Sequence, residues 1–184
     1  MSWRHRNPGI RPRPTFGSQL DHAARAGFPA TCTVLGMLVT QAPFGIAGQA
    51  VMLPAVTLAC VWFWSLFRPA AMPPAAVFGI GVLLDLLGYM PLGVGVLVLL
   101  LVHGIARRWR RFLGQTGFAM TWLAFAPVGV GAALLFWALV MALTLRLLPP
   151  GMALFQAALT AAFYPVLAIP LAWAHRSVPE ADAA

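Results

Sequence analysis

Charged side chains are scarce in this chain of 184 residues, and lysine is absent. Only 9% of the residues are charged, with four acids against twelve arginines, while 61% are hydrophobic and the mean hydropathy is +0.84. Residues 26–67 and 112–145 contain no Asp, Glu, Lys or Arg, and each run exceeds the ~20 residues that span a bilayer core. This composition excludes the soluble globular class and predicts an integral membrane protein of all-α fold.

Cysteine and the short motifs of catalytic sites are also scarce. Cys32 and Cys60 lie inside apolar runs and form no CxxC motif, and the chain has no Walker loop, GxSxG or HExxH motif. Together with His103 and His175 the cysteines would share one half of the membrane, which raises a metal-site hypothesis. Four such side chains on four helices often share a leaflet by chance, and no second-shell carboxylate is expected beside them, so we predict no metal, no cofactor and no enzymatic activity.

The excess of arginine over acidic residues is explained by the position of the arginines beside membrane spans. A pI of about 11.5 could indicate nucleic-acid binding, but the arginines border apolar runs. That placement sets membrane orientation and favours contact with anionic lipids, so we expect membrane lipids and no nucleic acid as partners.

Six spans divide the apolar sequence into residues 28–44, 49–67, 73–88, 92–106, 118–147 and 152–173. With this assignment eleven of twelve arginines fall on one side, and only Arg146 falls on the other. We therefore expect both termini in the cytoplasm. Residues 1–26 would form a basic arm with a short helix at 20–26, residues 27–175 the six-helix transmembrane domain, and residues 176–184 a short tail.

Asp85 is the only formal charge between Pro69 and Ala106, so it is the first candidate for function. One hypothesis pairs it with Arg146, the only opposite charge on that side of the membrane. A second has it cap free backbone N–H groups near Leu92 and Gly93. The span at 73–88 reaches only ~24 Å, and its recessed end would help to hydrate the carboxylate.

A surface of small residues follows the last span. Ala153, Ala157 and Ala161 repeat every four residues, and such surfaces allow close approach of helices in lipid. Internal packing and packing against a partner helix are both compatible with the pattern, and internal packing is the default.

Several short motifs together resemble the rod shape-determining membrane protein family, MreD. They are Pro54, Trp62-Phe63-Trp64, Arg68-Pro69, Phe78-x-x-Gly81, Asp85, Leu92-Gly93 and Tyr164-Pro165. The resemblance implies a non-enzymatic, multi-pass scaffold of the bacterial inner membrane in lateral cell-wall elongation and peptidoglycan synthesis. Its partners would be a single-pass MreC-like protein, MreB-like actin and the elongation enzymes. The residues that it assigns to fold or partner surface are Gly81, Asp85, Leu92, Gly93, Arg68 and Pro69, with Pro165 and Arg146 as further candidates.

Two alternatives remain open from the sequence. Vitamin-binding subunits of energy-coupling transporters are also six-span proteins of this size, but their Ala-x-x-x-Ala face on the first span is matched here only by Ala26 and Ala30, which straddle Pro29. Polar residues that could line a cavity are few: Gln41, Gln49, Asp85, Thr144 and Gln156. The other alternative is a helix-packing subunit of a different membrane complex.

Overall fold

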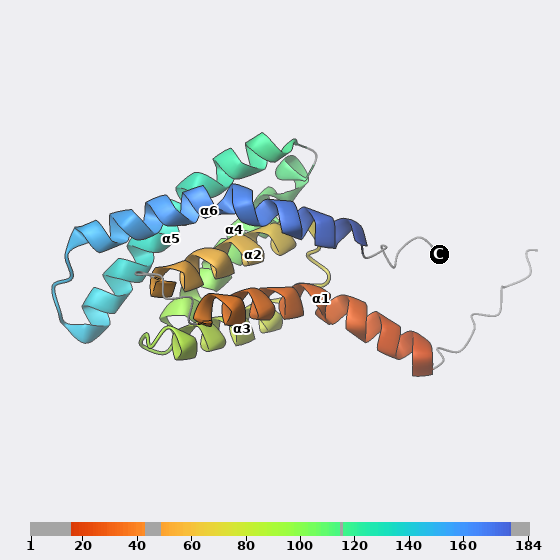
Figure 1. Cartoon of the computed structure of the whole chain (residues 1–184), viewed down its shortest axis with the longest axis horizontal. Coiled ribbons are helices and arrows are strands. Elements are labelled where there is room, and N and C mark those ends of the chain that lie inside the picture. The colour runs from red at the N-terminus through yellow and green to blue at the C-terminus, as the bar shows by residue number, and fades with distance from the viewer. Residues whose placement is uncertain (1–15, 43–48, 115, 178–184) are drawn as a thin grey trace, which may run out of the picture.

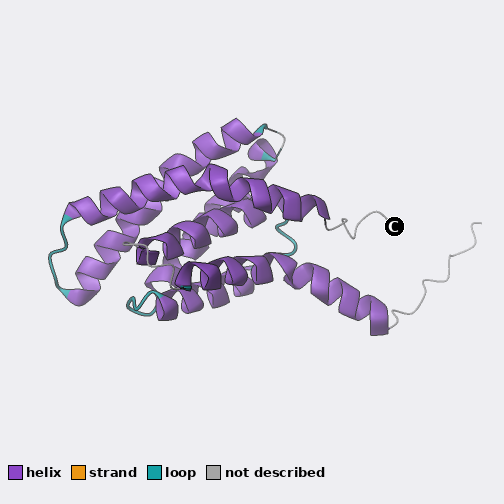
Figure 2. Ribbon diagram, viewed as in Figure 1, coloured by secondary structure: helices purple, strands orange, loops and turns teal. Residues whose placement is uncertain are grey.

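The computed structural model describes residues 16–42, 49–114 and 116–177, and these residues form helices joined by short loops (Figure 1). No strand occurs among them, which confirms the all-α prediction (Figure 2). The elements in chain order are α1 (Phe16–Gln41), the short 3-10 helix η1 (Gln49–Val51), α2 (Met52–Phe67), α3 (Pro74–Leu87), α4 (Val94–Leu113), α5 (Phe118–Thr144) and α6 (Pro150–Ser177).

Successive helices run in opposite directions between two ends of the bundle (Figure 1). The last turn of α1, the α3–α4 turn and the α5–α6 loop lie at one end. We call this the acidic end, because it holds Asp85. The α2–α3 loop, the α4–α5 loop and the last turn of α6 lie at the opposite end, which we call the arginine end.

Helix α2 occupies the centre of the bundle. Every residue from Leu53 to Leu66 is buried, and the helix packs against α1, α4 and α6. A helix that is apolar on all sides must be surrounded by other helices or by lipid, and here helices surround it. Trp62 and Trp64 are fully buried, so these two indole rings lie in the interior of the bundle.

Two helix boundaries differ from the prediction. Helix α1 begins at Phe16 rather than near residue 28, so it crosses the predicted domain boundary at residue 26 and continues through Pro29. The Thr33 hydroxyl donates to the Pro29 carbonyl at 2.8 Å, one turn further along the helix. Helix α4 extends past residue 106 to Leu113, because arginines in a last turn favour the negative end of the helix dipole.

The small-residue surface of α6 packs inside the bundle, as the default hypothesis held. Ala153 and Ala157 are buried, and α6 packs extensively on α5. Ala158 and Ala162, which flank that surface, are exposed. The small side chains therefore serve close packing of α6 inside the bundle, where its neighbours are α5 and α2.

Two helices, α5 and α6, are long and apolar enough to cross a membrane by length and composition. Only 28% of the apolar window of each is buried, whereas a core helix of a soluble protein is mostly buried. Large apolar side chains such as Ile169 and Trp173 point outward. An apolar exterior of this extent supports a membrane protein.

Candidate functional site

The candidate site is the turn between α3 and α4. Its first part is the C-terminal end of α3. The Gly88 amide donates to the Leu84 carbonyl at 2.8 Å, and the Met90 amide donates to the Asp85 carbonyl at 3.0 Å. The second bond is the one that closes a Schellman motif, in which the residue before the donor is left-handed. That residue is Tyr89, at φ +51°, where glycine would be usual.

The Asp85 side chain closes the start of the next helix. One carboxylate oxygen accepts the Gly93 amide at 2.8 Å, and the other accepts the Gly95 amide at 2.6 Å. These amides are among the N–H groups that have no partner within α4, and the positive end of the helix dipole favours a carboxylate there. Asp85 is only 1% exposed, so a single buried residue bonds the end of α3 to the start of α4.

Three glycines allow the two helices to come this close. A Cβ atom at Gly81 would stand 2.5 Å from the Val96 Cα, and one at Gly95 would collide with the Asp85 carboxylate. Gly93 has φ +101°, a conformation that costs residues other than glycine free energy. We call Gly81, Asp85, Gly93 and Gly95 the hairpin lock.

The pairing hypothesis for Asp85 is wrong. Arg146 lies in the loop after α5, is exposed, and forms no ion pair with Asp85 in the described part of the chain. The expectation that a recessed helix end hydrates the carboxylate is also wrong, because the start of α4 covers it. Two backbone N–H groups at the start of α4 donate to both carboxylate oxygens of Asp85, so the carboxylate needs no guanidinium from another hairpin. This confirms the capping hypothesis.

Exposed apolar side chains surround the lock at the acidic end. Tyr89 is 98% exposed and Leu92 is 70% exposed, and Leu86 near the end of α3 is 58% exposed. Leu92 and its neighbour Gly93 in the motif are thus both at the surface. We call Leu86, Tyr89 and Leu92 the turn rim.

The other predicted residues lie away from the lock. The Arg68 amide caps α2 through the Trp64 carbonyl at 2.8 Å, and the Arg68 guanidinium donates to His175 Nδ1 at 3.2 Å, near the end of α6. Pro69 follows it in the α2–α3 loop. Pro165 lies within α6 beside the buried Tyr164, whose ring stacks on Phe125.

The residues of the metal hypothesis have other surroundings. The His103 Nδ1 atom is 2.7 Å from the Ser65 hydroxyl, and His175 lies beside Arg68. In the ranges that the structure describes, no three His, Cys, Asp or Glu side chains gather where an ion could bind.

Sequence reasoning missed Gly95 and the Ser65–His103 pair. The signal for Gly95 is the Gly-x-Gly spacing with Gly93 at the start of an apolar helix, which is typical of a close backbone approach. No local sequence pattern indicates the Ser65–His103 pair, because the two residues are 38 positions apart and lie on different helices.

Chemically, the lock holds a carboxylate whose oxygens both accept backbone hydrogen bonds, so in this conformation Asp85 acts as a structural cap. What the lock offers to other molecules is the turn rim beside it. Comparisons of the chain with protein-family models, curated proteins and solved structures find no match.

Proposed function

We propose that this protein is a non-enzymatic scaffold of the bacterial inner membrane that acts in lateral cell-wall elongation and cell shape. The observation that carries the proposal is the hairpin lock. Gly81, Asp85 and Gly93, three of the positions that resemble the MreD family, come together in it, and the fourth, Leu92, stands on the rim beside it. These motif residues fix the conformation of a turn and expose its surface. That role is typical of a protein that binds other proteins.

The proposed topology is six spans with both termini in the cytoplasm. Support comes from the distribution of arginine: Arg68 and the four arginines between residues 107 and 111 lie at the arginine end, and Arg146 lies at the acidic end. Positive residues concentrate on the cytoplasmic side of membrane proteins. The acidic end, with the turn rim, would then face the periplasm.

The proposed partner at the turn rim is a single-pass MreC-like protein with its bulk in the periplasm. Tyr89 and Leu92 lie at the height where such a partner leaves the membrane, and aromatic side chains are enriched at the centres of protein interfaces. MreB-like actin and the elongation enzymes would join through this partner or through the arginine end.

The test is purification of a tagged full-length chain from its own membranes in mild detergent, with mass spectrometry of the proteins recovered. We expect a periplasmic coiled-coil protein and wall-elongation enzymes. Tyr89→Asn should reduce that recovery about tenfold, a typical loss for an exposed aromatic anchor. The matched control is Leu145→Asn, because Leu145 is also left-handed, at φ +52°, and 91% exposed at the same end.

Equal recovery with both variants would contradict the assignment of the turn rim. Recovery of a transmembrane coupling subunit with its ATPases, or of a tightly held vitamin, would overturn the scaffold proposal in favour of a transporter subunit. Since Asn tolerates a left-handed backbone better than Tyr or Leu, neither substitution should unfold the turn.

A further inference from the structure

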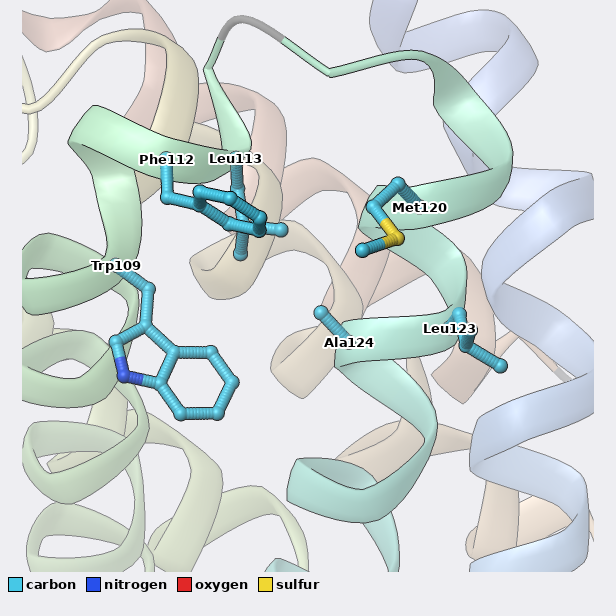
Figure 3. Close-up of a pocket in the computed structure, with 6 residues that line it drawn as sticks. All are labelled: Trp109, Phe112, Leu113, Met120, Leu123 and Ala124. Atoms are coloured by element: carbon cyan, nitrogen blue, oxygen red, sulfur yellow. The ribbon is translucent and has the colours of Figure 1, made fainter.

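An apolar groove follows the junction of α4 and α5 toward the arginine end. One cavity of about 450 Å³ is lined by Trp109, Phe112, Leu113, Met120, Leu123 and Ala124 (Figure 3). A second, of about 330 Å³, adjoins it at Trp109 and continues between the helices past Ile105 and Gly131 to Val98. All the residues that line the two cavities are apolar, and both cavities are open at the side rather than enclosed.

The groove has the length of one membrane leaflet. From Val98 to Trp109 helix α4 rises about 16 Å, while half of a hydrocarbon core is about 15 Å. Figure 3 shows the indole of Trp109 pointing into the space between α4 and α5. A tryptophan at this depth, near the end of an apolar helix, is typical of the boundary between acyl chains and headgroups.

Four arginines stand at the wide end of the groove. Arg107, Arg108, Arg110 and Arg111 are exposed, and Asp85, the carboxylate of the hairpin lock, lies at the opposite end of the bundle. Arg108 is one turn beyond Ile105 and one turn before Phe112, so it flanks both cavities. A guanidinium in that position can hold a phosphate by two parallel hydrogen bonds.

We propose that the α4–α5 groove is a binding site for one anionic phospholipid, with an acyl chain along α4 and the phosphate at Arg108. The inference rests on the membrane location in the proposed function and adds a ligand to it. An apolar partner helix could fill the groove too, but it would supply no anionic group to pair with the four arginines at the wide end. Charge complementarity therefore favours the lipid.

The test is native mass spectrometry of the full chain released from detergent micelles, titrated with phosphatidylglycerol or phosphatidylcholine. We expect one phosphatidylglycerol molecule to remain bound, about fivefold more tightly than phosphatidylcholine. Gly131→Leu should weaken binding of both lipids about tenfold, because its side chain takes the space of acyl methylene groups. A Cβ atom at Gly131 meets nothing within 4 Å, so the variant should fold.

The matched control is Gly104→Leu, an exposed glycine on α4 that does not line the groove and also has open space around it. It should bind both lipids as the natural chain does. Arg108→Gln tests the headgroup without changing the groove, and should abolish the preference for phosphatidylglycerol while phosphatidylcholine binding stays the same.

Equal binding of the two lipids by the natural chain would overturn the proposal, and so would full binding by Gly131→Leu. A polypeptide that copurifies with the natural chain and is lost in Gly131→Leu would assign the groove to a protein instead. Failure of the lipid assay with wall-elongation partners still recovered would overturn the groove alone. A chain that is soluble without detergent would overturn the membrane location and the groove together.

Discussion

The α3–α4 and α5–α6 hairpins are both pairs of antiparallel apolar helices, but they are joined by different means. In the first, a buried carboxylate bonds the start of α4, and two glycines bring the backbones together. In the second, neither helix contains an acidic residue, and the closest approach of Gly129 on α5 is to the side chain of Thr160 on α6. Its polar contacts are neutral indole bonds, such as Trp122 Nε1 to the Ala161 carbonyl at 3.0 Å.

Helix length explains the difference. Helix α3 has 14 residues and reaches about 21 Å, well short of a ~30 Å hydrocarbon core, so lipid alone does not fix its position along α4. Helices α5 and α6 have 27 and 28 residues, enough to cross with tilt. A short hairpin needs a specific bond to set its register, whereas a long one is aligned by the membrane.

The largest expected effect is that of Asp85→Ala. It removes both charge-assisted hydrogen bonds and leaves the buried Gly95 amide and the part-buried Gly93 amide without their acceptor, so the free energy of unfolding should fall by about 3 to 5 kcal/mol. Asp85→Asn keeps one acceptor and places a donor against the other amide, for a loss of about 2 kcal/mol. Unfolding in mixed detergent and SDS micelles, followed by circular dichroism, measures both values.

Arg146→Ala is the control for that measurement. Because Arg146 is exposed and makes no ion pair with Asp85, its removal should change the free energy of unfolding by less than about 0.5 kcal/mol. A loss with Arg146→Ala as large as with Asp85→Ala would restore the pairing hypothesis and break the contrast between the hairpins.

Gly81→Ala should have the next largest effect. Its methyl group would stand 2.5 Å from the Val96 Cα, and since backbone atoms cannot step aside, α3 and α4 must separate. We expect a loss of about 1 to 3 kcal/mol. Gly79→Ala, two residues earlier with nothing within 4 Å of the new methyl group, should gain roughly 0.5 kcal/mol through higher helix propensity. The same value for both variants would show that α3 and α4 are not closely packed.

The helices themselves could be predicted from the sequence, because long uncharged runs and Pro or Gly between them leave few alternatives. Their ends were less accurate. The arginines after residue 106 were predicted to form a loop because they are charged. Positive side chains in the last turn of a helix nevertheless stabilise its C-terminal end, and α4 continues through them. Pro29 was taken to stand at the start of a helix, but α1 continues through it.

At the site, the sequence identified Asp85 and named its backbone cap as one of two partners, but it could not choose between them. The choice depends on distance: Gly93 and Gly95 follow Asp85 within ten residues, and the turn brings them to it at once. Arg146 was proposed because it is the only opposite charge on that side of the membrane, and sharing a side does not bring two loops within bonding distance. The groove between α4 and α5 depends on tertiary packing, and no local pattern indicates it.

The smallest expected effect belongs to the α5–α6 hairpin and sharpens the comparison. A methyl group at Gly129 would stand 3.1 Å from the Thr160 Cγ2, a side-chain atom that can shift by a few tenths of an ångström. Gly129→Ala should therefore lower the free energy of unfolding by no more than about 0.5 kcal/mol, well below the loss at Gly81. Gly131→Ala, whose methyl group would meet nothing within 4 Å, is the matched control in the same SDS titration. A loss at Gly129 equal to that at Gly81 would mean that close backbone approach, rather than the Asp85 cap, is the common principle of both hairpins.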